Sequence, residues 1–138
     1  MSRSRRLNPF PVDPRYAGIY AHGVESVKPA RTVRVSGQIG IAPGGDLAQG
    51  FEYQCRQAIE NVLTVLADAS ASANDIVKMT FFLTRREDMD ALVKVRKALL
   101  EGVSPAITTV FVAGLVHPDW LVEVEATAVV ADGAAGHV

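Results

Sequence analysis

This sequence has a single cysteine, no long apolar run and no large excess of either charge. Cys55 is the only cysteine among 138 residues, so neither an intrachain disulfide nor a cysteine-based zinc cage can form. A reducing cytoplasm is therefore the expected setting. The 14 basic and 15 acidic residues give a formal net charge of −1. This balance supplies no positive field to hold a polyanion, and no apolar run reaches the length of a membrane span. Neither nucleic acid nor a membrane is therefore an expected partner.

The two ends of the chain carry little sign of structure. Residues 1–6 contain three arginines, and three prolines follow within residues 9–14. A secretory signal would need an apolar stretch in place of these prolines. A phosphate-binding arm would need further basic or aromatic residues, so a solvated tail is the favoured interpretation. We expect flexible segments over residues 1–15 and 132–138. Because no repeat or linker divides the remainder, residues 16–131 are predicted to form a single domain.

Hydrophobic periodicity predicts an α+β domain with the element order β-β-α-β-α-β-β. The predicted strands cover residues 20–27, 32–39, 76–84, 106–113 and 121–130. The predicted helices cover residues 47–69, with Asp46 as N-cap, and residues 86–101. The first two strands are predicted to pair through a turn at residues 28–30. Both helices are expected on one face of a mixed sheet.

Large apolar side chains are predicted on both faces of that sheet. In the third predicted strand, simple alternation places Ile76 and Phe82 on the face opposite Val77, Met79, Phe81 and Leu83. In the fourth, Val110 lies opposite Ile107. A sheet that is wet on one side alternates more cleanly, and each exposed side chain of this size would forgo roughly 1.5–3 kcal/mol of burial. We therefore expect a homo-oligomer that packs sheet against sheet.

Glu123 and Glu125 stand two residues apart on the last predicted strand, so they project from the same face. The apolar face of that strand has to meet the helices. Both carboxylates then point toward the face that a neighbouring subunit is expected to cover. Desolvation and a like-charged neighbour raise the pKa of a carboxylate, which makes either one a candidate general acid or base. The alternative is an ion pair with an arginine across the interface, and the spacing alone favours that alternative.

The remaining polar side chains form no recognised catalytic or metal-binding pattern. His22, His117 and His137 have no spacing typical of metal ligands, so no metal site is expected. Ser36 lacks the G-x-S-x-G turn of a hydrolase nucleophile. Tyr20 would face the same way as His22 on the first predicted strand, and the simplest interpretation of both is as surface aromatics.

Several segments, taken in order, resemble the RidA/YjgF family of enamine/imine deaminases. The segments are residues 35–39 (VSGQI), 57–62 (QAIENV), 75–80 (DIVKMT), 104–106 (SPA) and 122–126 (VEVEA). The resemblance covers the chain from about residue 16 to residue 130. It implies a chorismate-mutase-like fold and a homotrimer whose sheets line a central barrel. It also implies small-molecule clefts between subunits, with no metal or organic cofactor. The best-known members hydrolyse reactive 2-imino or 2-enamino acids to 2-oxo acids and ammonia.

The same resemblance implies roles for individual residues. Tyr20, in a Gly-Ile-Tyr segment, is similar to a tyrosine of the family's cleft, and Ser36 and Gly37 match the strand that lines it. Glu123, the first glutamate of Val-Glu-Val-Glu, matches the glutamate that places or activates the attacking water. Thr109 falls where the family often has cysteine.

One departure from the family pattern concerns the substrate itself. Ile107 stands where the family has the arginine that clamps the substrate carboxylate, and isoleucine supplies neither charge nor donor. Val93 similarly replaces an asparagine of the second helix. Arg34 or His22 is a candidate replacement for the missing cation.

Three hypotheses follow from this departure. The first is a cofactor-free deaminase for an imine or enamine other than the standard 2-imino acid, with Glu123 positioning water. The second is a trimeric ligand-binding or regulatory protein without catalysis. The third, an activity on RNA, ranks behind both because of the charge balance.

Overall fold

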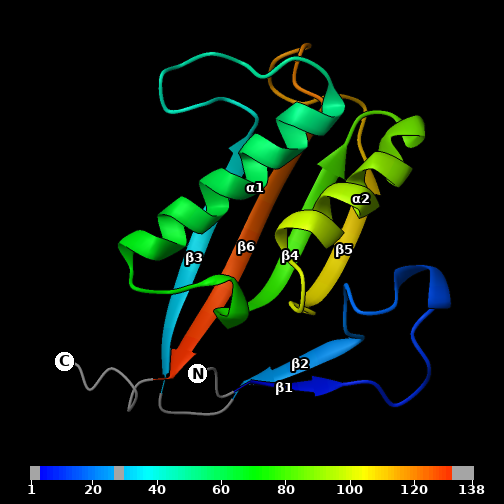
Figure 1. Ribbon diagram of the computed structural model, residues 1–138, viewed down its shortest axis with the longest axis vertical. Coiled ribbons are helices and arrows are strands. Elements are labelled where there is room, and N and C mark those ends of the chain that lie inside the picture. The colour runs from blue at the N-terminus through cyan, green and yellow to red at the C-terminus, as the bar shows by residue number, and fades with distance from the viewer. Residues whose placement is uncertain (1–3, 27–29, 132–138) are drawn as a thin grey trace.

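The computed structural model describes residues 4–26 and 30–131, and within them a four-stranded mixed sheet carries the helices on one face (Figure 1). Its strands, in spatial order, are β3 (Ala30–Ile39), β6 (Val122–Ala131), β4 (Ile76–Leu83) and β5 (Ala106–Phe111). β4 runs parallel to β5 and antiparallel to β6. Helix α1 (Phe51–Asp68) lies over β3 and β6, and α2 (Met89–Leu99) lies over β4 and β5. The predicted α+β fold is confirmed.

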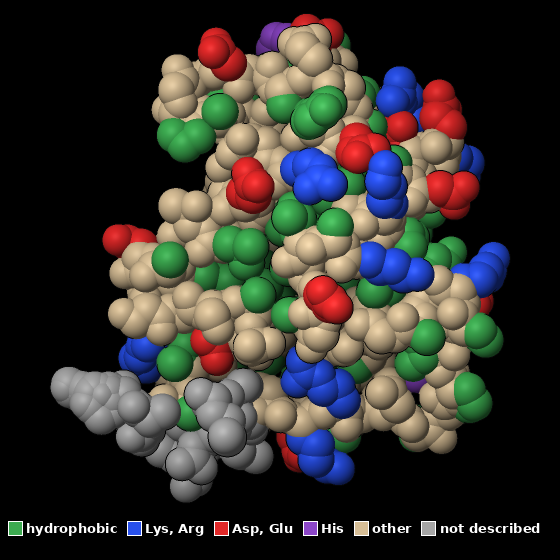
Figure 2. Space-filling model, in the orientation of Figure 1, with side chains coloured by type: hydrophobic (Ala, Val, Ile, Leu, Met, Phe, Trp, Pro, Cys, Tyr) green, Lys and Arg blue, Asp and Glu red, His purple; other side chains and the backbone are tan. Residues whose placement is uncertain are grey.

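The core lies between these helices and the sheet. On α1, Cys55, Ile59, Val62 and Leu66 are fully buried, as the three- and four-residue spacing predicts. Burial raises the pKa of the Cys55 thiol to about 12, so the thiol stays protonated at neutral pH. The outer side of the helices carries interspersed acidic and basic side chains (Figure 2). No helix in the described part of the chain combines the length and the apolar character needed to cross a membrane.

Helix α1 begins at Phe51, one turn later than the prediction with Asp46 as N-cap. Leu47 pairs with Ile41 in an isolated bridge, and the Ala48 amide donates to the Gly40 carbonyl at 2.9 Å. These contacts keep the preceding loop extended, so the helix starts after Gly50, whose φ is +86°. Gly40 is needed here for space, because a Cβ at this position would lie 2.5 Å from the Cα of Gln54.

The N-terminal strands form a separate antiparallel pair instead of extending the main sheet. β2 (Gly23–Ser26) pairs with β1 (Ser4–Leu7), which corrects the prediction that residues 20–27 pair with residues 32–39. Figure 1 shows this pair below one end of the main sheet. Arg6 ties it to the domain by donating to the Ser104 carbonyl at 3.1 Å. β1 lies inside the segment expected to be flexible, and the domain limits at residues 16 and 131 stay predictions. The predicted turn at residues 28–30 lies largely outside the described residues.

A bulge at the start of β4 changes which face its first residue occupies. Ile76 pairs with Ala128 and Lys78 with Thr127, so two steps along β4 match one along β6. The extra residue turns Ile76 into the core, where it is fully buried, and leaves Val77 half-buried. The prediction that Ile76 lies opposite Met79 and Phe81 is therefore wrong, because strict alternation does not anticipate a bulge.

The face opposite the helices is divided into a polar and an apolar part. A shallow hollow of about 170 Å³ on this face has mostly polar lining side chains: Arg34, Lys78, Thr80, Glu125 and Thr127. Toward the start of β6 the side chains on this face become mostly apolar. Two of the apolar side chains, Val110 and Val116, are 37% and 89% exposed. The apolar character predicted for this face therefore holds for only one part of it.

Candidate functional site

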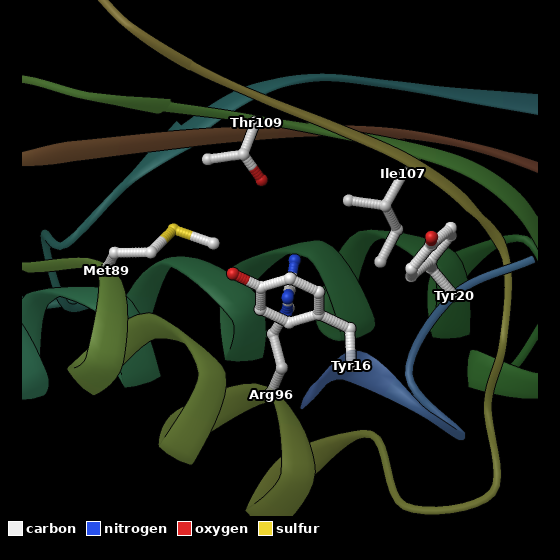
Figure 3. Close-up of a pocket in the computed structure, with 6 residues that line it drawn as sticks. All are labelled: Tyr16, Tyr20, Met89, Arg96, Ile107 and Thr109. Carbon is white, nitrogen blue, oxygen red and sulfur yellow. The ribbon is translucent and has the colours of Figure 1, made fainter. Parts of the chain in front are cut away.

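A cavity of about 300 Å³ opens between α2, β5 and the N-terminal segment (Figure 3). Its lining residues are Tyr16, Tyr20, Met89, Arg96, Ile107 and Thr109. Ile107 and Thr109 alternate along β5, so both reach the cavity from the helix-covered side of the sheet. In Figure 3 they extend toward Arg96, which extends from α2 in the opposite direction. We call this space the cavity.

Backbone contacts hold the two tyrosines at the cavity. The Ala21 amide donates to the Pro105 carbonyl at 2.9 Å, which forms a short parallel bridge with Ala106 and places Tyr20 beside β5. Tyr16 ends the short 3-10 helix η1 (Pro14–Tyr16). Gly18 follows with a φ of +82°, a left-handed conformation that returns the chain toward β5.

Arg96 is the charged group of the cavity, and sequence reasoning missed it. It is only 4% exposed, its Nε finds no hydrogen-bond partner, and it forms no ion pair with any residue of the described part of the chain. Its guanidinium carbon lies 5.3 Å from the centre of the Phe81 ring. Burial lowers the pKa of this guanidinium. Asp88, a buried acidic residue just before α2, instead receives two hydrogen bonds from Arg85 at 2.8 and 2.9 Å.

A sequence signal for Arg96 was present. Met89, Leu92 and Leu99 follow the helical apolar stripe of α2, and residue 96 occupies the position between them where the spacing calls for an apolar side chain. A charged residue at a stripe position is rarely buried unless it has a partner or a function.

The predicted catalytic residue lies on the opposite face of the sheet from the cavity. The Glu123 carboxylate lies directly against Gly37, where a Cβ would come within 2.7 Å of the Glu123 carboxyl carbon. A bulge between Val35 and Gln38 on β3 supplies the extra residue that brings Gly37 to this point. Glu123 also lines a hollow of about 280 Å³, which we call the Glu123 hollow. Its other lining residues are Phe82, Val112, Gly114, Leu115 and Val116.

The two glutamates of β6 have different surroundings although they share a face. Glu125 is exposed and lines the polar hollow with Arg34 and Lys78. Glu123 is half-buried among mostly apolar neighbours. Neither glutamate forms an ion pair within the described part of the chain, and the expected ion pair across a subunit interface stays a prediction for both.

The structure thus sorts the predicted site residues into two groups. Tyr20, Ile107 and Thr109 meet at the cavity, whereas Gly37 and Glu123 meet on the other face. Ser36 is exposed beside Gly37, and its carbonyl accepts a hydrogen bond from the Gln38 side chain at 3.1 Å.

Neither residue suggested as a substitute cation reaches the cavity. Arg34 lines the polar hollow on the other face. His22 packs on Phe10 and Tyr20, with ring centres 4.2 and 5.5 Å apart, and its amide donates to Asn8. No cluster of three potential metal ligands exists among the described residues, and His137 lies outside them.

Comparison with known proteins places the chain in a family. Residues 12–130 match the model of the family described as endoribonuclease L-PSP. The mouse 2-iminobutanoate/2-iminopropanoate deaminase is 33% identical over 107 residues, which cover 76% of this chain and 78% of the mouse protein. The chain belongs to the RidA/YjgF family. The resemblance drawn from the ordered motifs is therefore confirmed.

Solved structures of RidA/YjgF-family proteins share the fold. A Rid-family protein from Yersinia pestis, YyfB, superposes with a TM-score of 0.81 at 29% identity and covers 91% of this chain and 98% of its own. TdcF from Escherichia coli, solved with bound serine, gives a TM-score of 0.69 at 32% identity and covers 88% and 92%.

Proposed function

We propose that this RidA/YjgF-family protein hydrolyses a reactive imine or enamine to a carbonyl compound and ammonia, without a cofactor, in clefts between the subunits of a homotrimer. The observation that carries the proposal is the position of the Glu123 carboxylate. It lies against a backbone that only glycine leaves open, with no ion-pair partner among the described residues and mostly apolar neighbours. The name of the mouse relative, an iminobutanoate and iminopropanoate deaminase, supports the same reaction class.

The separation of the two residue groups supports an intersubunit site. Within one chain the sheet lies between the cavity and Glu123, so one small molecule cannot contact both. A second protomer that packs its cavity side near the Glu123 hollow of the first would complete the site. Exposed Val110 and Val116 supply apolar surface for such packing, with the outer faces of the sheets lining a central barrel.

Hydrolysis of an imine requires that the protein orient the substrate and supply one group that accepts and returns a proton. The imine nitrogen takes a proton from water in solution, and Glu123 accepts a proton from the attacking water as the water oxygen bonds to the imine carbon. Glu123 then returns its proton to the amine nitrogen of the carbinolamine. Ammonia leaves as the C–N bond breaks and the carbonyl forms, and the hydroxyl proton passes to water. A positioned carboxylate contributes typically 10²–10⁴-fold to such proton transfers, on the order of the effect expected here.

The direct test is ammonia release from freshly generated 2-iminobutanoate and from a neutral imine of similar size. We expect Glu123→Gln to lower the rate by about 100-fold or more, because the amide cannot accept the proton. Glu125→Gln is the matched control, since it removes the same charge from the same strand face and should leave the rate within about twofold. Full turnover by Glu123→Gln would rule out this mechanism.

Ile107 favours a second candidate, a ligand-binding or regulatory protein without catalysis. The clamping arginine of the family is absent at this position, so the orientation that turnover requires is not secured by β5. This candidate predicts saturable binding of a metabolite with no ammonia release above the uncatalysed rate. Efficient turnover of either imine would exclude it.

A further inference from the structure

We propose that Arg96 is the anion-binding residue of the cavity and that the ligand is a small organic carboxylate with an apolar side chain. The inference rests on the proposed function in that the ligand is taken to be the imine or its product. It adds the substrate's charge and the residue that binds it. It also replaces the expectation of an imine other than the standard 2-imino acid, which rested on Ile107 alone. The family's arginine on β5 is replaced by Ile107 in this chain, and Arg96 on α2 supplies the positive charge instead.

The protein groups around Arg96 do not offset the cost of burying its charge, which indicates that a ligand does. A guanidinium taken out of water is normally paired with a carboxylate and hydrogen-bonded through its donors. Here no described residue pairs with it, and its Nε is buried without an acceptor. The Phe81 ring, 5.3 Å away, compensates only part of the lost hydration. An anion bound in the cavity would pair with this charge.

The other residues that line the cavity indicate what the rest of the ligand is like. Ile107 and Met89 give the cavity apolar walls, while the Thr109 hydroxyl and the phenols of Tyr16 and Tyr20 offer hydrogen bonds. The volume of about 300 Å³ is at the small end for ligand sites. Among the described residues, Arg96 is the one cation that lines the cavity. A single guanidinium matches one carboxylate in a two-point contact better than a phosphate dianion.

The test compares binding in the full-length chain and two arginine variants, with 2-oxobutanoate and its neutral amide as probes in titration calorimetry. We expect Arg96→Met to weaken 2-oxobutanoate binding by about tenfold or more while leaving the weak binding of the amide unchanged. Arg86→Met is the matched control. Arg86 also lies over an aromatic ring, 4.9 Å from the centre of Phe111, but it is exposed and does not line the cavity. Its variant should bind both probes as the native chain does.

Thermal unfolding separates a binding role from a structural one. Methionine keeps most of the length of the arginine stem and removes an unpaired buried charge, so Arg96→Met should melt at a higher temperature than the native chain without ligand. Added 2-oxobutanoate should raise the melting temperature of the native chain but not that of the variant. A lower melting temperature for the variant would show that Arg96 stabilises the fold, and would overturn the proposal.

The remaining outcomes are also decisive. Equal affinity of the acid and the amide, unchanged binding by Arg96→Met, or no saturable binding of 2-oxobutanoate up to about 10 mM would each overturn the proposal. Inorganic phosphate that binds more tightly than the carboxylate, in an Arg96-dependent way, would overturn the assignment of ligand class. Glu123→Gln should retain binding, so carboxylate binding without turnover would contradict only the proposed reaction.

Discussion

The cavity and the Glu123 hollow lie on opposite faces of one sheet, yet they are built by different kinds of local structure. The Glu123 hollow depends on register: a bulge in β3 and a glycine bring backbone and carboxylate together. The cavity depends on tertiary packing, since an arginine from α2 meets strand and N-terminal residues far away in sequence. The Glu123 hollow can be recognised from short sequence motifs. The cavity is indicated in the sequence only by one charged residue on the apolar stripe of α2. A family motif can therefore be incomplete while the chemistry it serves is supplied from elsewhere.

The largest effect is expected from closing the contact between Gly37 and Glu123. A methyl group at residue 37 would overlap the Glu123 carboxylate, so Gly37→Ala should displace that side chain and lower ammonia release by about 100-fold. The overlap should also lower the free energy of unfolding by about 1–3 kcal/mol. Gly44→Ala is the control, because a Cβ there meets nothing within 4 Å. Native turnover by Gly37→Ala would show that the carboxylate need not lie against this backbone.

A smaller effect, of about tenfold, is expected from moving the cavity's cation between elements. Ile107→Arg alone places a second cation near Arg96 and should cost about 2 kcal/mol of stability. The double variant Arg96→Met/Ile107→Arg avoids that repulsion and should recover most of the 2-oxobutanoate affinity lost in Arg96→Met. Calorimetry and thermal unfolding of the three variants check both statements. Failure of the double variant to recover binding, although folded, would mean that the anion lies out of reach of β5.

The sequence predicted the Glu123 side of the site better than the cavity. The alternation of β6 correctly placed Glu123 opposite the helices, because side chains alternate faces with a period of two. The contact between Gly37 and Glu123 could not be predicted in this way, because it depends on the bulge in β3. Ile76 was misplaced because a bulge interrupts that period, and residues 20–27 were paired with the wrong strand because strand order is a tertiary property. Arg96 was missed because its burial depends on α2, β5 and η1 packing together.

The central claim is that the cavity of one protomer and Glu123 of another form one site. It is tested most directly by mixing Arg96→Met and Glu123→Gln chains, unfolding and refolding them together, and measuring ammonia release from 2-iminobutanoate. In randomly assembled trimers about one quarter of the clefts would pair an intact cavity with an intact glutamate, so about one quarter of native activity should return. No recovery above the separate variants, from mixed oligomers of verified composition, would contradict the shared cleft.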